Sequence, residues 1–156
     1  MAKQRTQFLC GQCGAVHPKW MGKCPDCGAW DALEHNEFPA TVMQALRPLY
    51  PVDPPSFMER LPHGYHDAAQ IRADLAAAGF SAPAQVETVA WRSRAATPEA
   101  VAIAFCQGTP MRGEIESRGS PTLDEATAAA TQALAARFGP GPVEGKIQAL
   151  IVKVSA

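Results

Sequence analysis

The stretches Cys10-Gly11-Gln12-Cys13 and Cys24-Pro25-Asp26-Cys27 decide how the beginning of this chain folds. Each Cys-x-x-Cys pair can place two sulfur atoms on one side of a tight turn, and two such turns that face each other form a tetrahedron. Zinc binds four thiolates in this geometry at about 2.3 Å, and a closed four-cysteine site is structural rather than catalytic. The sequence therefore predicts a small zinc ribbon with Cys10, Cys13, Cys24 and Cys27 as ligands.

The residues around these pairs fit a metal-binding hairpin. Gly14 and Gly28 directly follow the two pairs, and glycine adopts at little cost the positive φ that a metal knuckle needs. Residues 14–23 suffice for a short hairpin but not for a core. We expect His17 on the surface of this hairpin, because four thiolates complete the tetrahedron. Iron is the alternative metal, since Cys-Pro-x-Cys-Gly also suits rubredoxin-type sites, and two disulfides are the alternative without metal.

Composition agrees with a cytoplasmic metal-binding chain. Residues 1–8 are too polar for a signal peptide, and no run approaches the roughly 20 apolar residues of a membrane span. In a reducing compartment thiols stay free or bind metal, which favours metal over disulfides. The fifth cysteine, Cys106, is predicted to be a buried core thiol. The net charge of -1 argues against extensive binding of nucleic acid, because the basic excess that neutralises phosphates is missing.

Helix caps and apolar spacing predict four helices in the rest of the chain, residues 35–156. Asp67 with Gln70 and Thr122 with Glu125 match capping boxes, and Gly79 follows one of these helices as a stop signal. Proline directly after Thr97 is in the favoured first position of a helix. The four predicted helices begin after Asn36, Asp67, Thr97 and Thr122.

Two segments predict strands, at residues 85–92 and 146–154. The second is apolar on both faces, which is typical of a strand inside a sheet rather than at its edge. The expected fold class is therefore α+β, with a small zinc ribbon followed by a mostly helical segment that carries a two- to three-stranded antiparallel sheet. Its predicted division is a ribbon at residues 1–34 and a second segment at 35–156.

The sequence lacks the glycine-rich motifs that bind nucleotide phosphates. There is no G-x-x-x-x-G-K-[ST] loop. The glycines of residues 139–145 alternate with prolines and lead from a helix into a strand, which is the reverse of a phosphate-binding turn. We expect a connecting loop there. The sequence thus indicates no bound nucleotide cofactor.

His63-Gly64-Tyr65-His66-Asp67 is the best remaining candidate for chemistry. Two imidazoles, a phenol and a carboxylate lie within this short run, and such groups can hold a substrate or move a proton. Asp67 is already assigned to a helix cap, and exposed histidines are common in loops. A substrate-side loop with His63, Tyr65 and His66 and a purely structural loop are the two interpretations, and no catalytic residue is assigned.

Residues 1–34 resemble the N-terminal zinc finger of the bacterial RadA (Sms) DNA-repair proteins. The resemblance rests on both cysteine pairs and on the string Pro18-Lys19-Trp20-Met21-Gly22-Lys23 between them. In that family the finger precedes a RecA-like ATPase and a Lon-like domain. We expect neither here, because the chain is short and lacks a phosphate-binding loop. The resemblance implies a DNA or protein partner for the finger.

Residues 31–156 resemble the C-terminal part of SAM-dependent methyltransferases with the doubly wound fold. The resemblance implies that the two strands end a methyltransferase sheet and that the half that binds SAM is missing. SAM is therefore not expected as a cofactor. The matching strings include Asp53-Pro54-Pro55-Ser56-Phe57, Pro62-His63-Gly64-Tyr65-His66-Asp67, Ile71 to Phe80, Cys106-Gln107-Gly108-Thr109-Pro110 and Gly141 to Lys146.

Three functions follow from these observations. The first is a structural zinc module fused to a truncated methyltransferase segment that does not catalyse alone. The second is a methyltransferase whose missing half comes from another chain. The third is a DNA-repair accessory protein that contacts DNA or a repair partner through the finger. No membrane partner is expected, and an open sheet edge predicts self-association.

Overall fold

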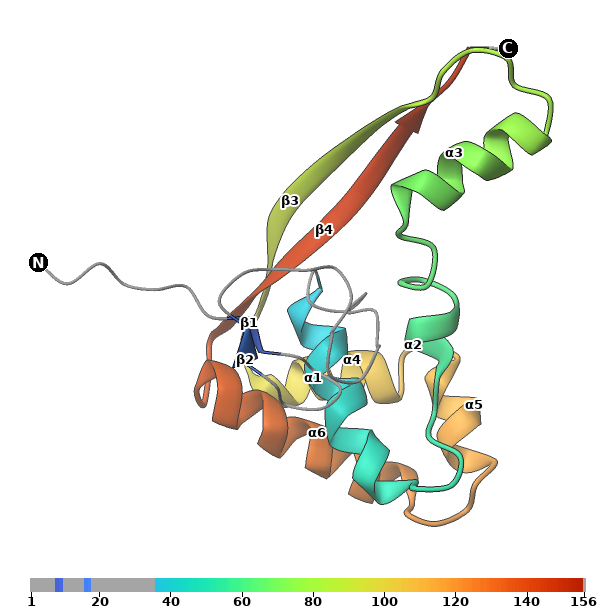
Figure 1. The fold of residues 1–156 in the computed structure, drawn as a ribbon. Coiled ribbons are helices and arrows are strands. Elements are labelled where there is room, and N and C mark those ends of the chain that lie inside the picture. Colours follow the sequence, from blue (N-terminus) through green and yellow to red (C-terminus); the bar gives the residue numbers. More distant parts are fainter. Residues whose placement is uncertain (1–7, 10–15, 18–35, 156) are drawn as a thin grey trace, which may run out of the picture.

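The computed structural model describes residues 8–9, 16–17 and 36–155 of the chain (Figure 1). In its first part, β1 (Phe8–Leu9) pairs antiparallel with β2 (Val16–His17), with Phe8 opposite His17 and Leu9 opposite Val16. The predicted metal ligands Cys10, Cys13, Cys24 and Cys27 lie outside the described residues.

Helices and two long strands make up residues 36–155. Figure 1 shows the β3–β4 ribbon rising from a group of helices formed by α1, α4, α5 and α6, while α3 lies beside the far end of the ribbon. No helix in the described part of the chain has the length and apolar character that crossing a membrane requires. The elements are α1 (Glu37–Leu46), the 3-10 helix η1 (Arg47–Leu49), α2 (Phe57–Arg60), α3 (Ala68–Ala77), β3 (Gln85–Ala95), α4 (Pro98–Cys106), α5 (Met111–Glu116), α6 (Leu123–Phe138) and β4 (Val143–Lys153).

The core lies between α1, α4, α5 and α6. Helices α4, α5 and α6 each bury one face against it, whereas α1 is buried on nearly all sides over residues 38–43. Phe38 of α1 meets Phe138 of α6 edge to face, with 5.1 Å between ring centroids. Cys106 is fully buried in this cluster as a free thiol, as predicted. The fully buried core side chains include Val42, Leu46, Met111, Ile115 and Leu134.

Strands β3 and β4 form an antiparallel pair from Gln85 opposite Lys153 to Ala95 opposite Val143. Among the described residues these two strands form a sheet of their own, which agrees with the lower limit of the predicted two- to three-stranded sheet. The prediction that the last strand is buried on both faces is wrong. Its beginning is buried against the helical core, whereas Ile147, Ile151 and Val152 further along the strand are exposed.

Local hydrogen bonds confirm most of the predicted helix ends. The Thr122 hydroxyl accepts from the Glu125 backbone N–H, and the Glu125 carboxylate accepts from the Thr122 N–H in return, so the predicted capping box of α6 is present. Gly79 and Gly139 both follow helices with φ of +93°, where a side chain would be strained.

Two predicted caps differ from the structure. Asp67 caps α3 as predicted, since its carboxylate accepts from the backbone N–H groups of Ala69 and Gln70. The Gln70 side-chain amide, however, donates to Asp74 instead of reaching back to complete a capping box. Asn36 precedes α1 without capping it. Its side-chain oxygen accepts a hydrogen bond from the Gln148 N–H at 3.1 Å, because β4 passes beside the beginning of α1.

Candidate functional site

The first candidate site is the four-cysteine segment at the beginning of the chain. β1 and β2 pair antiparallel, and in the sequence Cys10 and Cys13 stand between these two strands, outside the described residues. The donor set of four thiolates fits a tetrahedral zinc ion in a closed structural site. His17 lies in β2 opposite Phe8.

A groove of about 480 Å³ beside the β3–β4 ribbon is the second candidate site. This volume is in the range of small-ligand sites. The predicted loop residues His63, Tyr65 and His66 all line it, so the structure brings together the histidines and the tyrosine that the sequence singled out. The other lining residues are Asn36, Pro62, Ile71, Val89, Trp91, Ile147, Gln148, Ala149, Leu150 and Val152.

The polar groups of the loop are held by local partners. The Tyr65 hydroxyl donates to the Asp74 carboxylate at 2.7 Å, which raises the pKa of Tyr65. Burial lowers the pKa of His63, because desolvation disfavours the imidazolium. The His66 Nδ1 lies 3.2 Å from the carbonyl oxygen of Gly64, which requires Nδ1 to be the donor there. The arrangement indicates a loop held by local hydrogen bonds rather than an acid–base pair.

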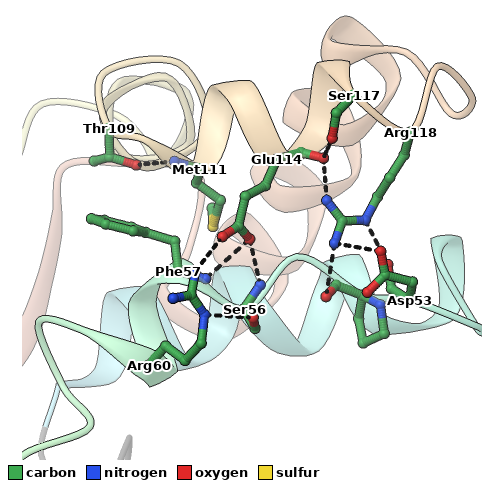
Figure 2. A network of polar contacts seen from close by, with 10 residues as sticks. Asp53, Ser56, Phe57, Arg60, Thr109, Met111, Glu114, Ser117 and Arg118 are labelled. Atoms are coloured by element: carbon green, nitrogen blue, oxygen red, sulfur yellow. Dashed lines mark hydrogen bonds and ion pairs between the residues drawn. The ribbon is translucent and has the colours of Figure 1, made fainter.

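Glu114 of α5 fixes the segment that leads into this loop (Figure 2). Its carboxylate accepts hydrogen bonds from the Ser56 and Phe57 backbone N–H groups at 2.7 and 3.1 Å and pairs with Arg60 at 2.8 Å. Burial alone would raise the pKa of Glu114, but these hydrogen bonds outweigh it and hold the pKa below its ordinary value.

Arg118, one turn further along the chain, holds the same segment from the other side (Figure 2). Its guanidinium donates to the carbonyl oxygen of Asp53 at 2.6 Å and pairs with the Asp53 carboxylate at 2.8 Å. Glu114 and Arg118 therefore anchor residues 53–60 to the helical core, and the position of the groove loop depends on them.

The described residues contain no other candidate centre. No group of three or more His, Cys, Asp or Glu side chains in residues 36–155 is arranged to hold a metal ion. Asn36, Trp91 and Gln148 also line the groove and were not predicted from the sequence. The alternation of β3 places Trp91 and Val89 on one face and could have indicated them, whereas the contact between Asn36 and Gln148 joins distant parts of the chain.

Comparison with known proteins gives a match at the beginning of the chain. Residues 8–35 match a zinc-ribbon family model described as "rubredoxin metal binding domain". The DNA repair protein RadA of Bacillus subtilis is 58% identical over 33 residues, which are 21% of this chain and 7% of that protein. RadA of Campylobacter jejuni is 47% identical over 49 residues, 31% of this chain and 10% of the relative.

These matches support an N-terminal zinc ribbon similar to the RadA zinc-finger region. The chain spans only about a tenth or less of the length of these relatives, so the likeness concerns the ribbon and not a whole repair protein. No solved structure matches the chain. The methyltransferase resemblance of residues 31–156 stays a hypothesis.

Proposed function

We propose that this chain is a structural zinc-binding module, residues 1–34, fused to the C-terminal segment of a SAM-dependent methyltransferase, residues 35–156, and that it does not transfer methyl groups by itself. The observation that carries the zinc role is that both Cys-x-x-Cys pairs fall within the matched ribbon segment, residues 8–35. Cys10, Cys13, Cys24 and Cys27 would hold the ion, whose contribution is to cross-link the ribbon and stabilise its fold.

Cobalt substitution tests the coordination of this site. Four thiolates around cobalt(II) give the intense visible absorption of tetrahedral coordination, whereas octahedral oxygen ligands do not. We expect the tetrahedral spectrum in the wild-type chain and its loss in Cys24→Ser. A visible absorption band in the protein as isolated would instead assign iron to the site.

The structure of residues 36–155 supports the proposal that the chain does not transfer methyl groups by itself. Residues 36–155 carry two sheet strands, and their exposed apolar side chains Trp91, Ile147 and Ile151 are what a strand pair taken from a larger sheet would leave uncovered. Calorimetric titration of SAM into the zinc-loaded protein should give no heat of binding. Binding of SAM would refute the proposal that residues 35–156 lack a SAM site. It would favour a methyltransferase whose missing half comes from another chain.

A role as a DNA-repair accessory protein is the second candidate function, and the RadA relatives favour it. Mobility-shift titrations at two salt concentrations test it, because contacts with phosphates weaken steeply with salt. A salt-sensitive shift that Cys24→Ser abolishes would support this role. The net charge of -1 leads us to expect no shift.

A further inference from the structure

The two edges of the β3–β4 ribbon are not equivalent. Along β4, the Lys146 N–H donates to the Glu37 carboxylate at 2.5 Å and the Gln148 N–H donates to Asn36. These N–H groups therefore point away from β3. The N-terminus of α1 thus covers the outer edge of β4 over its first half.

Among the described residues, the outer edge of β3 has no hydrogen-bonded neighbour. Because Lys146 and Gln148 face Arg92 and Ala90 in the register, the even-numbered residues of β3 also direct their backbone groups outward. In the part of the chain that the structure describes, no side chain or backbone group bonds to these positions from Val86 to Arg94. In Figure 1, β3 lies on the side of the ribbon away from α2 and α3.

We propose that this edge of β3 pairs antiparallel with β3 of a second copy of the chain, in a two-fold dimer centred on Ala90. Unpaired edges of this length are templates for strand pairing. On a two-fold axis perpendicular to the sheet, Ala90 faces its own copy, Thr88 faces Arg92 and Val86 faces Arg94. The two ribbons then form one four-stranded sheet.

The same register brings apolar side chains together on the face that meets α1. This face carries the odd-numbered residues, since a Cβ atom on Gly145 would lie 2.8 Å from the Phe38 ring. Val89 of one copy comes opposite Trp91 of the other, and an aromatic side chain next to a β-branched one is a favourable cross-strand pair. The indole of Trp91 is 76% exposed in the single chain.

The charges along this edge and the exposed indole of Trp91 favour a second copy in this register. Arg92 and Arg94 already pair with Glu144 of their own chain, and in the dimer they face Thr88 and Val86, so no like charges are opposed. The side chains of this face that adjoin the partner strand are Trp91 and Val89, and their exposed parts amount to on the order of 200 Å² of apolar surface per copy. Together with the paired backbone, this is a small interface of the kind found in weak complexes, so dissociation is expected at micromolar or higher concentrations.

Sedimentation velocity over a wide concentration range, with amide exchange on the same zinc-loaded samples, tests the proposal. We expect a reversible dimer and slow exchange at the outward amides of Thr88, Ala90 and Arg92, which a lone ribbon leaves open to solvent. Ala90→Pro removes an outward N–H without breaking a bond to β4 and should abolish the dimer, whereas Ala90→Val retains the N–H and should not. A monomer at every concentration, or protection at Leu150 and Val152 of β4 instead, would overturn the proposal.

A surface substitution tests the register without relying on proline. Thr88→Glu places a carboxylate opposite Arg92 of the partner, and Thr88→Lys places a like charge there. Since each contact occurs twice in a two-fold dimer, we expect the dissociation constant to fall about three- to tenfold in the first variant and to rise by a similar factor in the second. Equal dissociation constants for Thr88→Glu and Thr88→Lys would refute this register. If removal of the metal by a chelator is enough to dissociate the wild-type dimer, the contact lies in the zinc ribbon and not in β3.

Discussion

Gly145 of β4 lies directly against the ring of Phe38 of α1. A Cβ atom built on Gly145 would be 2.8 Å from Phe38 Cε1 and 2.9 Å from Cδ1. The same ring packs edge to face on Phe138, so it cannot move aside freely. This contact joins the ribbon to the helical core and makes glycine necessary at this strand position.

Replacing Gly145 by alanine should therefore destabilise the protein by about 1–3 kcal/mol, the usual cost of adding atoms to a packed contact. Urea unfolding followed by helical circular dichroism measures this cost. Gly113→Ala in α5 is the matched control, since nothing lies within 4 Å of its added Cβ atom, and alanine should there stabilise by about 0.5–1 kcal/mol. Equal stability of Gly145→Ala and wild type would show that the ring yields.

Glu114→Gln should destabilise the protein by about 1–2 kcal/mol at neutral pH, because the carboxylate accepts charge-assisted hydrogen bonds from residues 56, 57 and 60. The pKa of Glu114 is lowered in the folded state. Its stabilisation is therefore complete above the ordinary value of 4.5 and is lost as the pH falls through the lower folded value.

Unfolding of both proteins at neutral pH and at about pH 3 tests this linkage. The difference in stability should shrink at the acid pH. Glu116→Gln, which removes an exposed pair with Arg112, should have little effect at either pH. A difference between Glu114→Gln and wild type that does not change with pH would refute the carboxylate's role.

Cys106 should resist alkylation in the native protein. Burial raises the pKa of its thiol to about 11, and no part of the residue is exposed, so thiolate is scarce and inaccessible. Mass spectrometry after iodoacetamide treatment at mildly alkaline pH should find Cys106 unmodified until denaturant is added. Modification at the rate of an unfolded peptide would contradict the buried placement.

Metal removal should leave the fold of residues 36–155 unchanged. Among the described residues, the core cluster consists of side chains from Phe38 to Val143, and we expect it to hold without the ribbon, whereas a four-cysteine module takes its folding free energy from the metal. A strong chelator should therefore not alter the thermal unfolding of the helices. A parallel loss of helical signal with metal would contradict this independence.

Local features of the fold could be predicted from the sequence. The cap of Thr122 and Glu125, the stop at Gly79 and the helix after Thr97 follow from residues only a few positions apart, and the structure confirms them. The short helices α2 and α5 were missed, because one or two turns leave no apolar period to detect.

Features that depend on distant partners could not be predicted. Asn36 reads as a helix cap, but its side chain binds Gln148, over a hundred positions away in the chain. The apolar last strand reads as buried on both faces, yet Ile151 is exposed, because burial depends on which elements lie beside a strand. The groove residues His63, Tyr65 and His66 were found because they are neighbours in sequence, whereas Trp91 comes from another element.

Zinc content per chain tests the central claim most directly. Elemental analysis of the purified wild type, Cys24→Ser and Cys106→Ala proteins compares a predicted ligand with the one cysteine predicted to bind no metal. We expect one zinc ion per chain in the wild type and in Cys106→Ala, and a large loss in Cys24→Ser. Wild-type protein without metal, or full occupancy in Cys24→Ser, would contradict a four-cysteine structural site.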